Sequence, residues 1–108
     1  AGDVDKVEEA LDRDVFVDTT DSHGSTLLIL AVQTGNKRVV KALLRRGANI
    51  NAQNALGNTV LHYAHEYSFD DLADYLLSKG ADDRLLNASG LTPYEGISVK
   101  DDDDDGVG

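Results

Sequence analysis

The feature that most constrains this chain is a pattern that recurs every 33 residues. Gly24, Gly57 and Gly90 mark this interval along the sequence. A fixed interval of this size indicates an array of similar structural units, each packed on its neighbours, and not one central core. The same interval separates further positions: Thr26, Thr59 and Thr92; Leu43 and Leu76; Gly47 and Gly80.

The interval divides the chain into four units and a tail. We expect a partial repeat at residues 1–20, full repeats at 21–53 and 54–86, and a partial capping repeat at 87–100. Residues 101–108 contain five consecutive Asp residues, which favours a disordered acidic tail or linker. Because the chain has no Met and begins within a repeat, we expect it to be part of a longer protein.

Each full unit carries signals for a turn followed by two short helices. In the first full unit, Gly24 suits a turn that needs a positive φ, and Thr26 is a helix N-cap. The first helix should end near Gln33, and a second should run over about residues 37–46 with apolar residues on one face. Gly47 should end it. In the last unit, the run Thr92-Pro93-Tyr94-Glu95 predicts another helix start.

These motifs resemble the ankyrin repeat family over nearly the whole chain outside the acidic tail. The resemblance implies an all-α ankyrin-repeat solenoid, in which helix-turn-helix units stack and β-hairpin loops project from them. It also implies a concave surface, built from hairpin tips and first helices, that binds other proteins. The motifs are G-x-T-x-L at Gly24–Leu28 and Gly57–Leu61, G-L-T-P-Y at Gly90–Tyr94, and L-L-x-x-G-A at Leu43–Ala48 and Leu76–Ala81.

Departures from the family pattern are local. Leu27 and Val60 stand where the family usually has Pro, and Ser68 stands where the preceding repeat has Gly35. Ile29 replaces a His that only His62 retains. These changes weaken single caps and turns without threatening the fold.

Carried over position by position, the resemblance implies a protein-binding surface. Leu56, Tyr67 and Leu91 do not fit the buried pattern of the unit. We expect them to form an apolar strip inside a polar rim, because apolar anchors contribute most of the energy of an interface. The alternative is that they are scattered exposed apolar residues, which are common. The expected contact residues are Ser22, His23, Ser25, Gln33, Thr34, Ala55, Leu56, Asn58, Glu66, Tyr67, Ala88, Ser89 and Leu91.

Charge and cysteine content limit the classes of partner and location. The net charge of -10 disfavours nucleic acids and anionic membranes, and it favours another protein with a basic surface. The absence of Cys excludes disulfides and fits an intracellular location, for which we expect the cytoplasm before the nucleus. We expect a monomer with no cofactor. No nucleophile–base pair, phosphate-binding loop or dinucleotide motif occurs, so no catalytic residues are assigned.

The expected second helix of the first full repeat is basic. It contains Lys37, Arg38, Lys41, Arg45 and Arg46, which in isolation would suggest a phosphate or nucleic-acid patch. The repeat register favours a charge ladder between neighbouring second helices, whose exposed pairs are weak. The expected rows are Asp5, Arg38 and Asp71; Glu8, Lys41 and Asp74; and Asp12 beside Arg45.

Two groups of residues have the composition of a metal site, and we assign a metal to neither. His62, His65 and Glu66, with His23 one repeat away, could hold zinc, but the order HExxH is absent. We expect His62 to pair with the helix-start Thr59, and His65 to be a packed, hydrogen-bonded core residue. Asp101–Gly106 resembles the opening of a calcium loop but lacks the Glu that the loop requires.

The resulting hypothesis is a non-catalytic protein–protein interaction module, a scaffold or targeting part of a larger intracellular protein. The alternative is a structural or regulatory domain that docks in cis onto a catalytic domain of the full-length protein.

Overall fold

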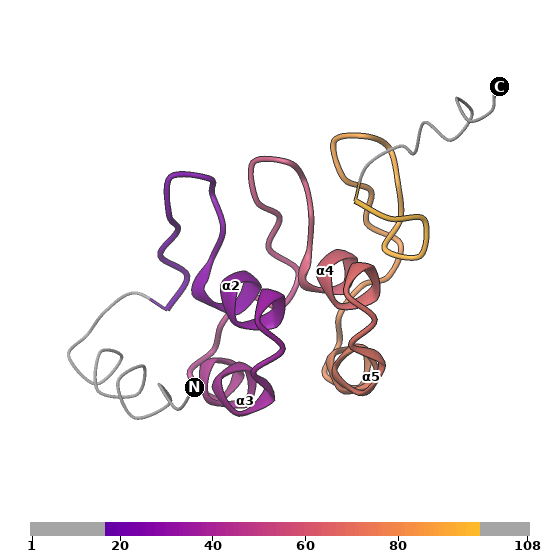
Figure 1. Cartoon of the computed structure of the whole chain (residues 1–108). Coiled ribbons are helices and arrows are strands. Elements are labelled where there is room, and N and C mark those ends of the chain that lie inside the picture. The colour runs from indigo at the N-terminus through magenta and orange to yellow at the C-terminus, as the bar shows by residue number, and fades with distance from the viewer. Residues whose placement is uncertain (1–16, 98–108) are drawn as a thin grey trace, which may run out of the picture.

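A computed structural model describes residues 17–97, and in this part of the chain the helices form two stacked pairs (Figure 1). Helix α2 (Leu27–Gln33) pairs with α3 (Lys37–Arg45), and α4 (Val60–Glu66) pairs with α5 (Asp70–Ser78). Long loops before each pair project to one side of the helices. Within the described residues there is no strand, only an isolated bridge between Thr20 and Thr26. The expected all-α repeat architecture is confirmed.

The first helix of each pair begins at a threonine cap, as the sequence predicts. At α2 the N–H of Ile29 donates to Thr26 Oγ1 at 3.2 Å. At α4 the N–H of His62 donates to Thr59 Oγ1, and the N–H of Thr59 donates to His62 Nδ1 at 3.1 Å. This reciprocal capping box satisfies two backbone donors that the helix itself cannot satisfy. Thr59 and His62 therefore pair as expected.

The turn between the two helices of a pair needs a residue with positive φ. Gly35 supplies it in the first pair with a φ of 71°. In the second pair the position is held by Ser68 with a φ of 59°, which is unfavourable for a residue with a side chain. A Cβ atom at Gly35 would lie 3.0 Å from the ring of Phe69, so the glycine also makes room for Phe69 to pack on the preceding repeat.

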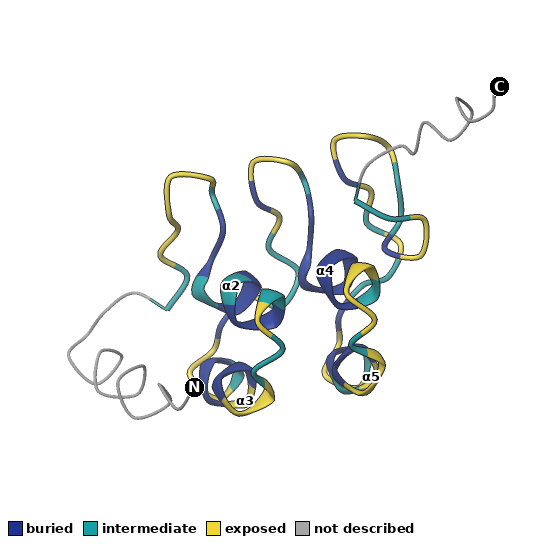
Figure 2. Cartoon of the chain, viewed as in Figure 1, coloured by how far each residue is buried: buried dark blue, intermediate teal, exposed yellow. Residues whose placement is uncertain are grey.

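The core lies between the helices of each pair and between neighbouring pairs (Figure 2). It is continuous from one repeat to the next, because α2 packs against both α3 and α4. Each unit is thus stabilised mainly by its neighbour, as in other repeat arrays. The largest fully buried apolar side chains are Leu28, Ile29, Val32, Val40, Leu43, Val60, Leu61 and Leu76.

The loops of successive repeats are joined at their tips by backbone hydrogen bonds. The N–H of Ala55 donates to the carbonyl of His23, and the N–H of Ala88 donates to the carbonyl of Leu56, both at 2.9 Å. Three hairpin-shaped loops therefore lie side by side, in register with the helix pairs below them.

The helix expected after Thr92 does not form within the described residues. The local signals are satisfied: Glu95 Oε1 accepts from the N–H of Thr92 at 2.8 Å, and the N–H of Glu95 donates to the carbonyl of Thr92 at 3.0 Å. Gly96 then takes a φ of 117°, which is incompatible with a right-handed helix. Thr92 therefore starts a single turn.

Some expectations fall on residues outside the described range. These are most of the partial repeat at residues 1–20, the acidic tail with its calcium-like sequence, and the ladder partners Asp5, Glu8 and Asp12. Between residues 17 and 97, no helix is long and apolar enough to cross a bilayer.

Candidate protein-binding surface

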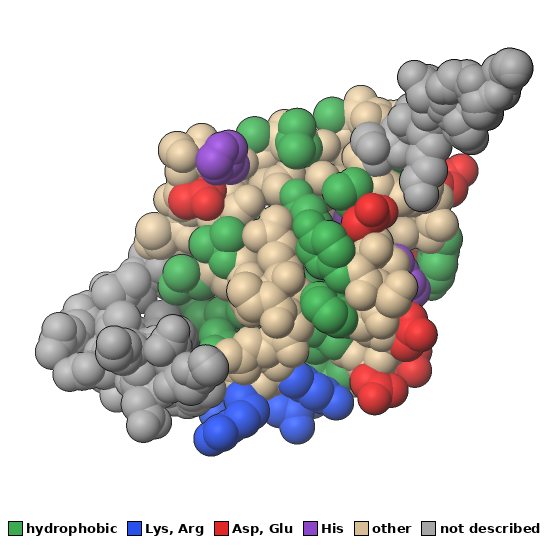
Figure 3. Space-filling model, in the orientation of Figure 1, with side chains coloured by type: hydrophobic (Ala, Val, Ile, Leu, Met, Phe, Trp, Pro, Cys, Tyr) green, Lys and Arg blue, Asp and Glu red, His purple; other side chains and the backbone are tan. Residues whose placement is uncertain are grey.

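A groove lies between the first two described loops, above the helices α2 and α4. Its volume is about 340 Å³, and most of its lining surface is apolar. Figure 3 shows hydrophobic side chains gathered along the face of the molecule between the two repeats. The groove is lined by Asp21, His23, Ser25, Leu30, Gln33, Asn54, Ala55, Leu56 and Tyr63.

The groove floor is held by a buried network centred on Asn54. Asn54 Oδ1 accepts from the N–H groups of Leu56 and Asn58, which shapes the loop tip. Asn54 Nδ2 donates to Ser25 Oγ in the preceding loop at 3.2 Å and to the hydroxyl of Tyr63 at 2.9 Å. One amide side chain therefore fixes both walls of the groove and the ring on its floor.

A carboxylate lies at the edge of this groove. Asp21 Oδ1 accepts from the N–H of Ser25 at 3.0 Å and from the N–H of His23 at 2.9 Å. These donors, that of Ser25 first, lower the pKa of Asp21 below its usual value of 3.8. The exposed groove edge is therefore negatively charged at neutral pH.

An aromatic strip continues from the groove toward the start of α5. The ring centroids of Tyr63 and Tyr67 are 6.1 Å apart, and those of Tyr67 and Phe69 are 5.9 Å apart. Tyr67 is 45% exposed and Leu56 is 64% exposed. Both side chains are thus available to a partner, next to the apolar groove floor.

Most of the expected contact residues are at the surface, and two are not. Ser25 and Asn58 are only 4% and 1% exposed. Their expected surface position is corrected, because Ser25 accepts from Asn54 and Asn58 Oδ1 accepts from Asn87 Nδ2 at 2.9 Å across the repeat boundary. Gln33 and Leu91 are half-buried, and the exposed remainder are Ser22, His23, Thr34, Ala55, Leu56, Glu66, Tyr67, Ala88 and Ser89.

The groove unites only part of the expected set. Ala88, Ser89 and Leu91 belong to the third loop and do not line it. Sequence reasoning missed Leu30 and Tyr63, although they are 33 residues apart on the two first helices. That equivalence was the available signal: each is a large residue on the helix face that the loops overhang.

His62 is a fully buried histidine that joins α4 to the third loop. Its Nδ1 accepts from the N–H of Thr59, and its Nε2 lies 2.9 Å from the carbonyl oxygen of Leu91. The neutral ring with hydrogen on Nε2 satisfies both contacts. Burial lowers the pKa of His62 below its usual value of 6.5, more than the Leu91 carbonyl raises it.

We predict that the domain loses stability as the pH falls below about 6.5, because of His62. The unfolded chain takes up the proton at its ordinary pKa, whereas the folded chain resists it, so protonation favours unfolding. One such group changes the free energy of unfolding by at most about 1.4 kcal/mol per pH unit. Urea unfolding at pH 7.5, 6.5 and 5.5 measures the slope. A His62→Gln variant should show a flatter slope, and an unchanged slope would contradict the assignment.

His65 packs as expected but is not hydrogen-bonded as expected. Its ring lies 4.7 Å from the ring of Tyr94, and its buried Nε2 has no hydrogen-bond partner. Tyr94 turns away toward Asp83, to which its hydroxyl donates at 2.6 Å. Within residues 17–97, no three His, Asp or Glu side chains are arranged to hold a metal ion.

The described part of the charge ladder is also corrected. In residues 17–97, no ion pair joins Arg38 to Asp71 or Lys41 to Asp74. Lys41 instead lies over the ring of Tyr75, with its Nζ 5.4 Å from the ring centroid. The long lysine side chain reaches an aromatic face in place of a carboxylate.

Comparison with known proteins agrees with this architecture. The family described as "Ankyrin repeats (3 copies)" matches residues 1–87. Protein phosphatase 1 regulatory subunit 27 of Mus musculus is 38% identical over 95 residues, which are 87% of this chain and 62% of that protein. The 2-5A-dependent ribonuclease of Homo sapiens is 44% identical over 63% of this chain and 9% of its own length. Ankyrin repeat and SAM domain-containing protein 6 of Rattus norvegicus is 31% identical over 95% of this chain and 12% of its own length.

These relatives extend well beyond the region that they share with this chain. The shared region is the repeat array, and the match to the family covers more than half of the chain. The repeated motifs, the stacked helix pairs and the projecting loops all agree with that match. The chain belongs to the ankyrin repeat family.

Proposed function

We propose that the groove and the aromatic strip beside it bind a segment of a partner protein. The observation that supports this proposal most is the position of Leu56 and Tyr67, two exposed apolar side chains next to a preformed apolar groove. Central apolar anchors with a polar surround are typical of protein interfaces. The ionised Asp21 at the groove edge favours a partner segment with basic residues beside its apolar anchor.

The same proposal gives the domain a non-catalytic role in a larger intracellular protein, in the cytoplasm before the nucleus. The name of the mouse relative supports a regulatory role and suggests protein phosphatase 1 as the first partner to test. The ribonuclease relative does not argue for catalysis here, because the shared region is 9% of its length.

The test uses a pair of matched double variants. Leu56→Ala/Tyr67→Ala removes the two anchors, and Leu86→Ala/Tyr94→Ala removes a Leu and a Tyr that are 53% and 58% exposed outside the groove. We expect the first variant to weaken binding at least about tenfold, whether to purified protein phosphatase 1 or to a protein captured from native lysate. The second variant should bind like the unchanged domain.

Affinity is measured by surface plasmon resonance on each captured partner, and thermal unfolding checks that both variants remain folded. Equal binding by the anchor variant and the unchanged domain would overturn the groove assignment. Loss of binding in both variants would point to a different or more diffuse surface.

A second candidate is docking in cis onto a catalytic domain of the full-length protein. The ribonuclease relative supports it, because there a similar region is a small part of a protein named for an enzyme. Co-expression of the full-length flanking regions with the isolated domain distinguishes the two candidates. Binding to the chain's own flanking regions, lost with Leu56→Ala/Tyr67→Ala, favours docking in cis.

A further inference from the structure

A second surface, away from the groove, is formed by the helices α3 and α5. These helices lie on the side of the molecule opposite the projecting loops (Figure 1). Three lysines converge there on one aromatic ring: the Nζ atoms of Lys37, Lys41 and Lys79 lie 5.2, 5.4 and 5.6 Å from the ring centroid of Tyr75. The three lysines are exposed and Tyr75 is half-buried between them.

Positive charge is concentrated on this surface in an otherwise acidic chain. The segment from Lys37 to Arg46 supplies five of the ten Lys and Arg residues, although the net charge is -10. Figure 3 shows Lys and Arg side chains gathered at the lower edge of the molecule, over α3. A patch of this sign in a chain of the opposite sign is a local site for an anion.

The three lysines lack carboxylate partners in the described part of the chain. The ion pairs that residues 17–97 make among themselves are His23–Asp21 and Arg84–Asp82. The ring of Tyr75 attracts the ammonium groups through its negative face but cannot neutralise them. Three like charges held around one ring therefore leave their N–H donors available to an external anion.

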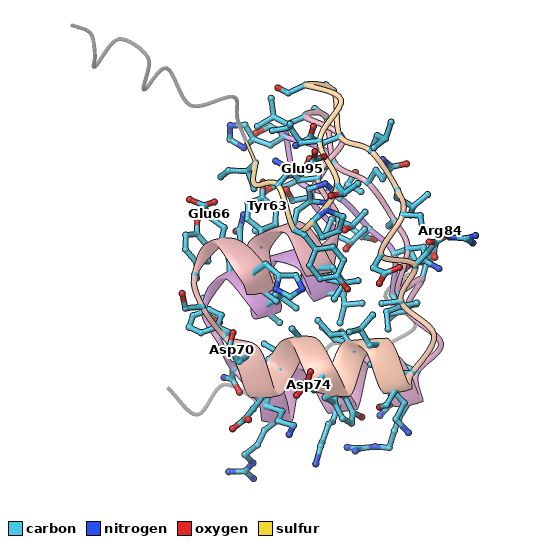
Figure 4. The ribbon with its side chains drawn as sticks, turned by 90° about the vertical axis from the view of Figure 1, so that its right-hand side faces the viewer. Tyr63, Glu66, Asp70, Asp74, Arg84 and Glu95 are labelled. Atoms are coloured by element: carbon cyan, nitrogen blue, oxygen red, sulfur yellow. The ribbon has the colours of Figure 1, made fainter. Side chains whose placement is uncertain are left out.

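Nearby carboxylates limit the size of the anion that fits. Asp70, Asp71 and Asp74 are exposed on α5, and Figure 4 shows Asp70 and Asp74 on this helix. A long polyanion or an anionic bilayer would meet these carboxylates and the net negative charge of the chain. A short segment with clustered carboxylates can contact the lysines without reaching that row.

We propose that the Lys37, Lys41 and Lys79 cluster around Tyr75, here called the lysine patch, binds a short acidic segment of a second partner protein. Carboxylate oxygens accept from the three ammonium groups, and the Tyr75 ring holds those groups in place. Because this patch and the groove lie on different elements, the domain can bind two partners of opposite charge at once.

The test measures the binding of a fluorescein-labelled peptide with six consecutive Glu residues by fluorescence anisotropy at low salt. Lys37→Gln/Lys41→Gln should raise the Kd at least about tenfold, because two charge-assisted contacts are lost. Arg84→Gln/Lys100→Gln changes the net charge by the same amount and should change the Kd less than about twofold. The anchor variant Leu56→Ala/Tyr67→Ala should bind the peptide normally.

The measurement is repeated on a chain in which Asp101–Asp105 are replaced by Asn, which removes any competition from these carboxylates. No measurable binding by either form would overturn the proposal. Equal weakening by both double Gln variants would show a general charge effect, and loss with the anchor variant would place the peptide in the groove. Tighter binding of a single-stranded DNA oligonucleotide or of phosphatidylserine vesicles would assign the patch to a different class of partner.

Discussion

Replacement of Gly57 by Ala should cost about 3–5 kcal/mol of the free energy of unfolding, the largest single effect that we expect in this chain. Gly57 has a φ of 78°, which an L-residue adopts only under strain. A Cβ atom there would also lie 2.6 Å from the backbone nitrogen of Ala88 and 2.9 Å from backbone atoms of Asn87. Backbone cannot move aside as a flexible side chain can, so the loop tips must separate.

Two other glycines serve as controls for Gly57→Ala. At Gly47 the φ is 87°, but an added Cβ would meet nothing within 4 Å, so Gly47→Ala should cost only about 1–2 kcal/mol of strain. At Gly24 the nearest backbone atom, the nitrogen of Ala55, would be 3.0 Å away, which predicts an intermediate loss. Urea unfolding gives the three free energies. Equal losses at all three positions would show that strain, not the contact between loops, determines the cost.

Replacement of Asn54 by Ala should cost about 3 kcal/mol of the free energy of unfolding. The change removes four hydrogen bonds from a side chain that is 8% exposed. It leaves the N–H groups of Leu56 and Asn58 without their acceptor and the hydroxyl of Ser25 without the amide donor. Tyr63 keeps a hydrogen bond from Asn58 Nδ2 at 3.2 Å, which limits the loss at the groove floor.

Asp21 is the natural control for Asn54, because it is the equivalent residue one repeat earlier. It accepts from two backbone N–H groups of its own loop but has no amide to donate across the repeat boundary, and it is exposed. Asp21→Ala should therefore cause a clearly smaller loss in the same urea titration. Similar losses for Asn54→Ala and Asp21→Ala would mean that the network between repeats contributes little.

The helices and their bounds could be predicted because the signals for them are local. Thr26 and Thr59 cap the helices that follow them, and Gly47 and Gly80 end the second helices with positive φ. The prediction was wrong at Thr92, where a complete set of start signals gives one turn. A start signal satisfies only the first backbone donors, and Gly96 interrupts the residues that a helix would need next.

The candidate site could be predicted only where exposure follows from the repeat pattern. Leu56 and Tyr67 interrupt that pattern, and both are exposed. Ser25 and Asn58 are polar loop residues like their exposed neighbours, yet the amide of the next repeat draws each of them inward. Such a choice depends on contacts between units, which the sequence of one unit does not contain.

The lysine patch shows a similar limit. The repeat register places Lys41 beside Asp74, and this proximity suggested an ion pair. An exposed ion pair is weak, so a long side chain selects among several partners of nearly equal energy. The half-buried ring of Tyr75, one residue further along α5, attracts Lys41 together with Lys37 and Lys79.

The hydrogen bond from Ala55 to His23 joins two residues that also line the groove, one from each wall. It fixes the width of the groove before any partner arrives. A partner segment that enters therefore meets a preorganised slot, and little conformational entropy of the domain is lost on binding. The entropic cost of association falls almost entirely on the partner, so a segment already rigid in its free state should bind much more tightly than a flexible one of the same sequence.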